Sequence, residues 1–146
     1  LRHPECISSI DEFATGSAFK EVYDETELAN IKADKVSKMV FCSGKIYYDL
    51  IAYRREQKIK DAVIVRIEQL YPYPEDQIDA IFTKYKKADI RWVQEEPANM
   101  GALNYIRNLF PNTAKMISRK PSASTATGFK KIHDRQQLEI MVKAFE

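Results

Sequence analysis

The spacing of apolar residues changes near Lys35 and divides the chain into two unequal parts. After Lys35, runs of β-branched and aromatic residues alternate with segments whose apolar residues recur at helical spacing. The runs predict strands at residues 36–42, 62–67, 89–94 and 114–118. The helically spaced segments predict helices over residues 46–53, 74–85, 101–110 and 132–145.

This order of elements predicts the fold class. Strands that alternate with helices of this length imply parallel pairing through right-handed crossovers. Residues 62–67 (AVIVRI) are almost continuously apolar, as is typical of a strand covered on both faces. We therefore expect an α/β fold, a three-layer sandwich around a mostly parallel sheet of four or five strands.

Apolar spacing also predicts which helix faces turn toward the sheet. In the third helix the predicted inward residues are Leu103, Ile106, Leu109 and Phe110. In the closing helix they are Leu138, Met141, Val142 and Phe145.

The apolar residues within residues 1–34 follow no regular spacing for long. We interpret this segment as a connecting arm that packs on something outside this chain. Residues 8–12 (SSIDE) predict one capped helical turn, because hydroxyls accept free N–H groups and acids favour the positive helix end. Residues 19–22 predict a short strand, and residues 25–31 at best a weak helix. The sequence thus predicts an arm, residues 1–34, and an α/β domain, residues 35–146.

Composition and charge exclude several protein classes. The chain has 146 residues, of which 45% are hydrophobic and 30% charged, so a disordered or collagen-like chain is excluded. No uncharged apolar run approaches the ~18 residues of a membrane helix, so we expect no membrane contact. The net charge is +2 with both signs mixed along the chain, which argues against a nucleic-acid partner.

The two cysteines, Cys6 and Cys42, lie far apart in the sequence. A secreted scaffold would have more cysteines at closer spacing, so we expect a reduced, buried Cys42 and a cytoplasm-like compartment. The chain begins at Leu1 without a leader, and we expect it to be part of a longer protein.

Ligands of parallel sheets usually bind beyond the carboxyl ends of the strands. Lys45 follows Ser43–Gly44 at such an end, where helix N–H groups and a lysine can hold a phosphate. The alternative, which the local sequence favours, is a tight turn with an exposed lysine. Glu95 and Glu96 follow another strand, but neighbours on an extended chain point in opposite directions and need not share a site. A polar turn with an interface or capping role is the alternative.

Other chemistry finds little support in the sequence. His3 and His133 have no partners at metal-ligand spacing, so we expect no metal site. No serine stands in a G-x-S-x-G setting, and Cys42 has no histidine nearby in sequence. We therefore expect no catalytic residue in this chain, and a domain that assists chemistry located elsewhere.

Several sequence blocks together carry a resemblance to a known family. They are LRHPE (1–5), SSIDEF (8–13), FCSGKIYYDL (41–50), AVIVRIEQLY (62–71), QEEPANMG (94–101) and RKPSASTATG (119–128). In this order they resemble the C-terminal region of the thiamine-diphosphate-dependent component of 2-oxoglutarate dehydrogenase. The likeness covers essentially the whole chain, although Met100, Ser118 and Thr125 stand where members usually have Gln, Gly and Pro.

The resemblance implies a transketolase C-terminal-like domain of a homodimeric enzyme. The parent enzyme decarboxylates 2-oxoglutarate and passes the succinyl group to a lipoyl group on the dihydrolipoyl succinyltransferase component. It would hold thiamine diphosphate and Mg²⁺ outside this chain, which itself would bind neither cofactor and be inactive alone. The parent would be cytoplasmic in a bacterium or lie in the mitochondrial matrix of a eukaryote.

The resemblance also implies site residues, since some members carry a regulatory nucleotide or acetyl-CoA site involving this domain. For such an anion site we expect Lys45, Arg54, Arg2 and Arg119. For an interface we expect Glu95, Glu96, Asn99, Ser122 and Ser124. Two alternatives stay open: an autonomous acyl-CoA or nucleotide binding module, and a purely structural interaction domain.

Overall fold

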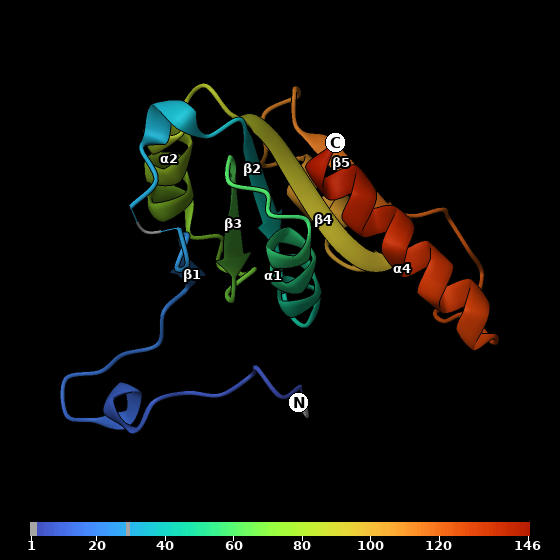
Figure 1. Ribbon diagram of the computed structural model, residues 1–146, viewed down its shortest axis with the longest axis horizontal. Coiled ribbons are helices and arrows are strands. Elements are labelled where there is room, and N and C mark those ends of the chain that lie inside the picture. Colours follow the sequence, from blue (N-terminus) through green and yellow to red (C-terminus); the bar gives the residue numbers. More distant parts are fainter. Residues whose placement is uncertain (1–2, 29) are drawn as a thin grey trace.

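A computed structural model describes residues 3–28 and 30–146 (Figure 1). The strands are β1 (Val22–Tyr23), β2 (Lys38–Cys42), β3 (Ala62–Ile67), β4 (Asp89–Pro97) and β5 (Lys115–Arg119). The α-helices are α1 (Ile46–Glu56), α2 (Glu75–Lys84), α3 (Leu103–Arg107) and α4 (Lys130–Phe145). Two short 3-10 turns, η1 (Ile10–Phe13) and η2 (Ala33–Lys35), precede the first long strand.

The sheet has the order β1-β3-β2-β4-β5. Strands β2 to β5 pair in parallel, and β1 adds an antiparallel edge strand against β3. Helices α1 and α4 pack on one face of the sheet, and α2 and α3 pack on the other. The predicted α/β sandwich with a mostly parallel five-stranded sheet is confirmed.

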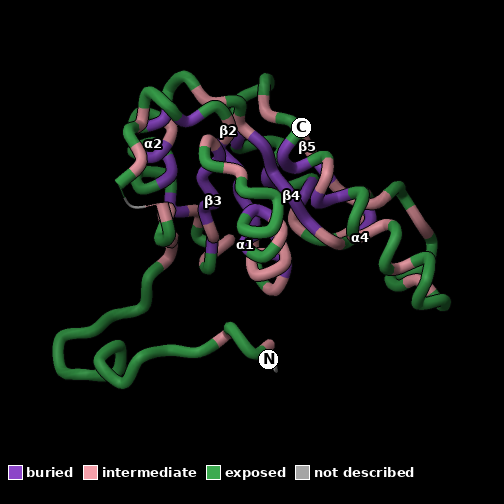
Figure 2. The backbone as a smooth tube through the Cα atoms, in the orientation of Figure 1, coloured by how far each residue is buried: buried purple, intermediate pink, exposed green. Residues whose placement is uncertain are grey.

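Each face of the sheet buries its own apolar cluster, because side chains alternate along the strands. Phe41 and Trp92 point toward α2 and α3, whereas Val40 and Val93 point toward α1 and α4. The buried residues follow the strands in the centre of the molecule (Figure 2). Cys42 is free and fully buried, and its burial raises the pKa of the thiol far above the ordinary value.

Two predicted helix faces were partly wrong. Leu109 lies beyond the end of α3 and is 39% exposed, because this helix ends at Arg107. Leu138 is 55% exposed. The face of α4 that meets the sheet is instead made by Ile140, Met141, Ala144 and Phe145.

The third helix is also shorter than its predicted range, 101–110. Gly101 has a φ of +64°, which an L side chain rarely adopts, and a helix cannot continue through it. The amide of Gln94, which is 4% exposed, donates to the carbonyl oxygens of Pro97 (3.2 Å) and Met100 (2.8 Å). Gln94 thereby fixes a turn that delays the helix to Leu103.

The first 34 residues behave in two ways. The predicted capped turn at residues 8–12 is confirmed as η1, whose Ser9 Oγ accepts the N–H of Asp11. Residues 7–20 are exposed and form an open loop that extends away from the sheet. The start of this loop lies on the side of α1 (Figure 1). By contrast, residues 22–23 belong to the sheet, so the predicted division at residue 34 stays a prediction.

The weak helix predicted over residues 25–31 is wrong for the described part of that range, residues 25–28 and 30–31. The carboxylate of Glu25 accepts the N–H groups of Glu27 (2.8 Å) and Leu28 (2.9 Å) and thereby closes a non-helical turn.

Candidate functional site

The carboxyl ends of β2, β4 and β5 meet a polar network between α1 and α4. Lys45, which precedes α1, places its Nζ 2.7 Å from Asp49 Oδ2 and 3.3 Å from Glu95 Oε2. Gln137 of α4 donates to the same two oxygens, at 2.9 Å and 3.2 Å. The network therefore joins two helices to the end of β4.

The electrostatics of this network do not favour an anion at Lys45. Burial opposes the charge of Lys45, but the hydrogen bond to Asp49 and the nearby Glu95 carboxylate outweigh it and raise the Lys45 pKa. One ammonium thus faces two carboxylates, so a phosphate placed there would meet net negative charge.

Arg119 joins this network from its other side. Its Nη2 donates to Gln137 Oε1 at 2.9 Å and lies 3.2 Å from His133 Nδ1. A guanidinium has no acceptor, so Nδ1 of His133 accepts in this contact. Neither partner is a carboxylate, and among the described residues Arg119 forms no ion pair.

The structure does not bring Arg54 to this site. Arg54 lies near the far end of α1, nine residues after Lys45, where it is 2% exposed. It donates to both oxygens of Glu25 and, at 3.1 Å each, to Glu27 Oε2 and Ala62 O. Its donors are therefore occupied by protein groups, and it is not available to hold a phosphate beside Lys45.

Arg2 lies outside the described residues. Of the expected anion-site residues, the network joins only Lys45 and Arg119, through Gln137.

The expected interface residues fall into two groups. Glu95 belongs to the network with Lys45. Its neighbour Glu96 lies outside this network and lines a cavity of about 560 Å³ together with Tyr71 and Tyr105. This cavity begins beside Gly44, so it also lies beyond the carboxyl ends of the strands.

Asn99 and Ser122 pair with each other through two bonds between the Asn99 amide and the Ser122 backbone, at 2.9 Å and 3.0 Å. Ser124 continues this loop by donating its backbone N–H to Ser122 Oγ at 3.0 Å. These three residues hold the loop after β5 in place.

Sequence reasoning missed Asp49 and Gln137 as members of the network. Asp49 stands four residues after Lys45, and such i,i+4 pairs face each other on a helix, so the spacing held a usable signal. Gln137 is separated from Asp49 by 88 positions, and only the packing of α4 on α1 brings the two together.

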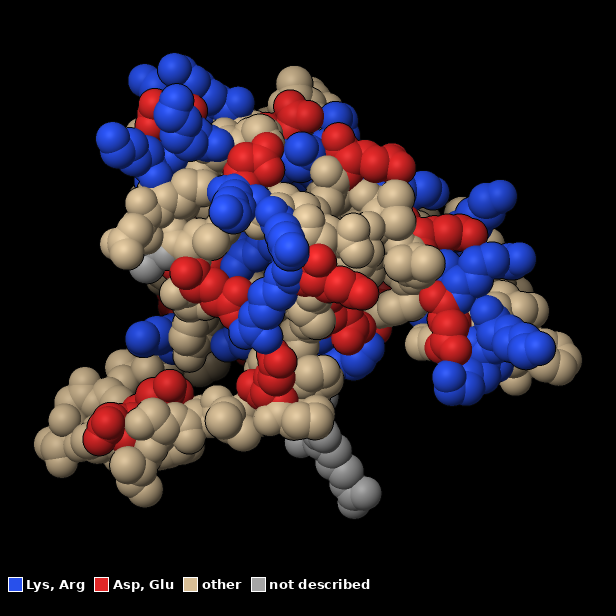
Figure 3. Space-filling view, viewed as in Figure 1, with Lys and Arg blue, Asp and Glu red and all other residues tan. Residues whose placement is uncertain are grey.

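The surface charges are mixed, and the described residues offer no cluster of metal-ligating side chains. Acidic and basic side chains intermingle over the face seen in Figure 3, with the largest basic cluster at the upper left over α2. Within residues 3–28 and 30–146, no group of three or more His, Cys, Asp or Glu side chains is placed to hold a metal ion. Among the described helices, none is both long and apolar enough to cross a membrane.

Comparison with known proteins identifies the family. The family model described as 2-oxoglutarate dehydrogenase C-terminal matches residues 7–145. The oxoglutarate dehydrogenase of Buchnera aphidicola is 44% identical over 99% of this chain. The mitochondrial 2-oxoglutarate dehydrogenase of Caenorhabditis elegans is 39% identical, and the 2-oxoglutarate dehydrogenase E1 component of Rickettsia typhi is 38% identical, each over 99% of the chain.

The chain spans only a small part of these relatives, 16% of the Buchnera and Rickettsia proteins and 15% of the Caenorhabditis protein. The family match nevertheless covers the arm from residue 7 and all strands and helices of the sheet domain. The chain therefore belongs to the 2-oxoglutarate dehydrogenase C-terminal family.

Proposed function

We propose that this chain works as the C-terminal domain of a 2-oxoglutarate dehydrogenase E1 component. That enzyme oxidatively decarboxylates 2-oxoglutarate and transfers the succinyl group to the lipoyl-bearing succinyltransferase component. The observation that carries the proposal is 38–44% identity over 99% of the chain to proteins with this name. The parent enzyme works in the bacterial cytoplasm or in the mitochondrial matrix.

We assign thiamine diphosphate and Mg²⁺ to other parts of the parent enzyme, because the residues of this chain do not fit them. The carboxylates of Asp49 and Glu95 already hold Lys45 and Gln137, and within residues 3–28 and 30–146 no group of three or more His, Cys, Asp or Glu side chains is placed to hold a metal ion. Within the described residues, this domain supports the chemistry and does not perform it.

The supporting role we propose is dimer formation and control of access to the active site. Four large apolar side chains of the arm, Ile7, Ile10, Phe13 and Phe19, are 69–84% exposed. Large exposed apolar groups on one segment indicate a contact with another part of the parent enzyme. We propose that the arm packs on that part. We also propose that the cavity beside Glu96 lies on the approach to the active site.

Complementation tests this function. The parent E1 truncated before this chain is co-expressed with the chain, and 2-oxoglutarate-dependent succinyl transfer to the lipoyl domain is measured. We expect no activity from either piece alone and restored activity from both together. The matched control is Phe41→Asp, which places a charge in the core and should abolish rescue. Succinyl transfer by the chain alone would contradict the proposal.

A further inference from the structure

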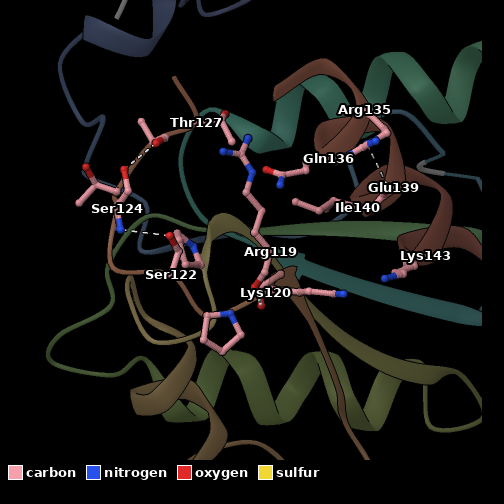
Figure 4. Close-up of a pocket in the computed structure, with 15 residues that line it drawn as sticks. Arg119, Lys120, Ser122, Ser124, Thr127, Arg135, Gln136, Glu139, Ile140 and Lys143 are labelled. Carbon is pink, nitrogen blue, oxygen red and sulfur yellow. Dashed lines mark hydrogen bonds and ion pairs between the residues drawn. The ribbon is translucent and has the colours of Figure 1, made fainter. Parts of the chain in front are cut away.

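A polar cavity of about 390 Å³, distinct from the one beside Glu96, is lined by Arg119 (Figure 4). Its walls are the end of β5, the loop of residues 120–127 and the outer side of α4. This volume lies in the range of small-molecule sites, about 300–1,000 Å³.

Positive charge dominates this cavity. Its lining includes the cations Arg119, Lys120, Arg135 and Lys143 but a single carboxylate, Glu139. Arg135 lies 3.7 Å from Glu139, whereas the other three cations make no ion pair within the described part of the chain. Arg119 is only partly exposed, and a partly buried charge without a counter-charge is costly unless an anion compensates it.

Three buried polar atoms of the lining residues also lack hydrogen-bond partners among the described residues. They are Arg119 Nε, Thr127 Oγ1 and Gln136 Oε1, contributed by β5, the loop and α4. In Figure 4 the guanidinium of Arg119 lies between Thr127 and Gln136. Buried polar atoms are rarely left unpaired, so these three leave unused donor and acceptor capacity in the wall of the cavity.

The loop that closes the cavity presents hydroxyl groups and has a defined path. Ser122, Ser124, Thr125 and Thr127 all line the cavity, and of these the Ser124 hydroxyl already donates to Ala126 O at 2.7 Å. The pairing of Asn99 with Ser122 ties this loop to the end of β4. Hydroxyl donors on a fixed loop beside an arginine suit an anion with several oxygens.

We propose that this cavity binds a phosphate monoester of a small hydroxylated compound, with the phosphoryl group held by Arg119. A phosphate monoester carries about −1.5 to −2 charge at pH 7, which suits the excess of cations better than a single carboxylate does. Its oxygens accept from the guanidinium and the loop hydroxyls. A hydroxyl of the same compound pairs with the side-chain amide of Gln136, which lines the cavity.

Isothermal titration of the 146-residue chain with glycerol 3-phosphate at low salt tests the site. Arg119→Gln should weaken binding about 10- to 100-fold, since it removes a charge-assisted contact. Lys143→Gln should weaken it about 3- to 10-fold through lost attraction, and this exposed position leaves the fold unchanged. The control is Arg107→Gln, an exposed arginine on the other face of the sheet, which should bind like the wild type.

Three further titrants define the ligand. Glycerol should not bind, and inorganic phosphate should bind more weakly than glycerol 3-phosphate, because it offers Gln136 a poorer partner. Malate carries carboxylates and a hydroxyl, and tighter binding of malate than of glycerol 3-phosphate would overturn the phosphoryl assignment. Absence of saturable binding by any of these anions, or equal affinity in the Arg119→Gln and Lys143→Gln variants and the wild type, would overturn the site itself.

Discussion

Two arginines at opposite ends of the sheet domain show how differently the same side chain is used. Arg54 is 2% exposed, and Glu25, which is equally buried, Glu27 and a backbone carbonyl together occupy its donors. Arg119 is partly exposed, and within the described residues its side chain donates only to His133 and Gln137 and its buried Nε has no partner. The first has its counter-charge built into the chain, and the second does not.

We infer from this difference that the Arg54–Glu25 pair stabilises the fold, whereas Arg119 binds a ligand. The Glu25 carboxylate also accepts the N–H of Ile64 in β3, so the Arg54–Glu25 pair joins the first segment of the chain to α1 and to the sheet. Removing either charge would leave the other buried and unpaired. Removing the charge of Arg119 leaves no carboxylate unpaired, so we expect its loss to affect a ligand more than the fold.

The largest expected effect follows from breaking the Arg54–Glu25 pair. Glu25→Ala should lower the free energy of unfolding by about 3–5 kcal/mol, because it leaves the guanidinium of Arg54 buried without its main partner. Arg119→Gln should change it by less than about 1 kcal/mol. Urea unfolding followed by circular dichroism measures both, and equal losses in the two variants would contradict the distinction.

A smaller effect is expected at the turn that supports the carboxyl end of the sheet. A Cβ at Gly101 would lie 3.0 Å from Gln94 Nε2, and the φ of +64° is strained for any other residue. Gly101→Ala should therefore cost about 1–3 kcal/mol. Gly44→Ala is the matched control, since Gly44 has a φ of +75° but open space around its Cβ position. A cost at Gly44 as large as that at Gly101 would show that backbone strain alone, and not contact with Gln94, is responsible.

The pH dependence of stability should also depend on Glu25. Burial raises its pKa, but the hydrogen bonds from Arg54, Leu28 and Ile64 outweigh burial and hold the pKa below the ordinary value of 4.5. A carboxyl whose folded pKa is depressed adds stability above its unfolded pKa and loses it as the pH falls toward the folded value. Thermal unfolding between pH 6 and about 3 should show a steeper loss in the wild type than in Glu25→Gln. Parallel curves would contradict this role.

The smallest effect is expected at Lys45. Its side chain is 37% exposed, and partly exposed ion pairs contribute about 0–1 kcal/mol. Lys45→Met should therefore lower the unfolding free energy by less than about 1 kcal/mol, and most of that loss should disappear at high salt. A loss above about 2 kcal/mol, or one independent of salt, would show that the network matters as much as the Arg54–Glu25 pair.

The fold could be predicted because local patterns agree with it. The apolar run of residues 62–67 corresponds to β3 without a shift of either end. The predicted helix boundaries were wrong where a polar side chain binds the backbone and fixes a turn. The Gln94 amide shortened the third helix, and the Glu25 carboxylate replaced a helix with a turn.

The candidate site was less predictable, because its residues come from distant parts of the chain. Lys45 and Arg119 share the carboxyl end of the sheet, as the parallel topology implies, but the two carboxylates that neutralise Lys45 were not foreseen. Arg54 looked like an anion ligand by residue type alone. Its partner Glu25 lies 29 positions away, in a segment without a clear period, so no local pattern reveals the pair.

The central claim is that Arg119 serves ligand binding and not stability. The most direct test is urea unfolding of the wild type and of Arg119→Gln, each with and without glycerol 3-phosphate. A ligand that binds only the folded state raises its stability by about 2.7 kcal/mol at 100 times the Kd. With ligand at 100 times the wild-type Kd, we predict a stabilisation of about 2.7 kcal/mol in the wild type and of about 0.4–1.4 kcal/mol in Arg119→Gln, whose Kd should be 10- to 100-fold higher. Without ligand, the two proteins should differ by less than about 1 kcal/mol. Destabilisation of Arg119→Gln by clearly more than about 1 kcal/mol without ligand, or the same ligand-induced shift in both proteins, would contradict the account.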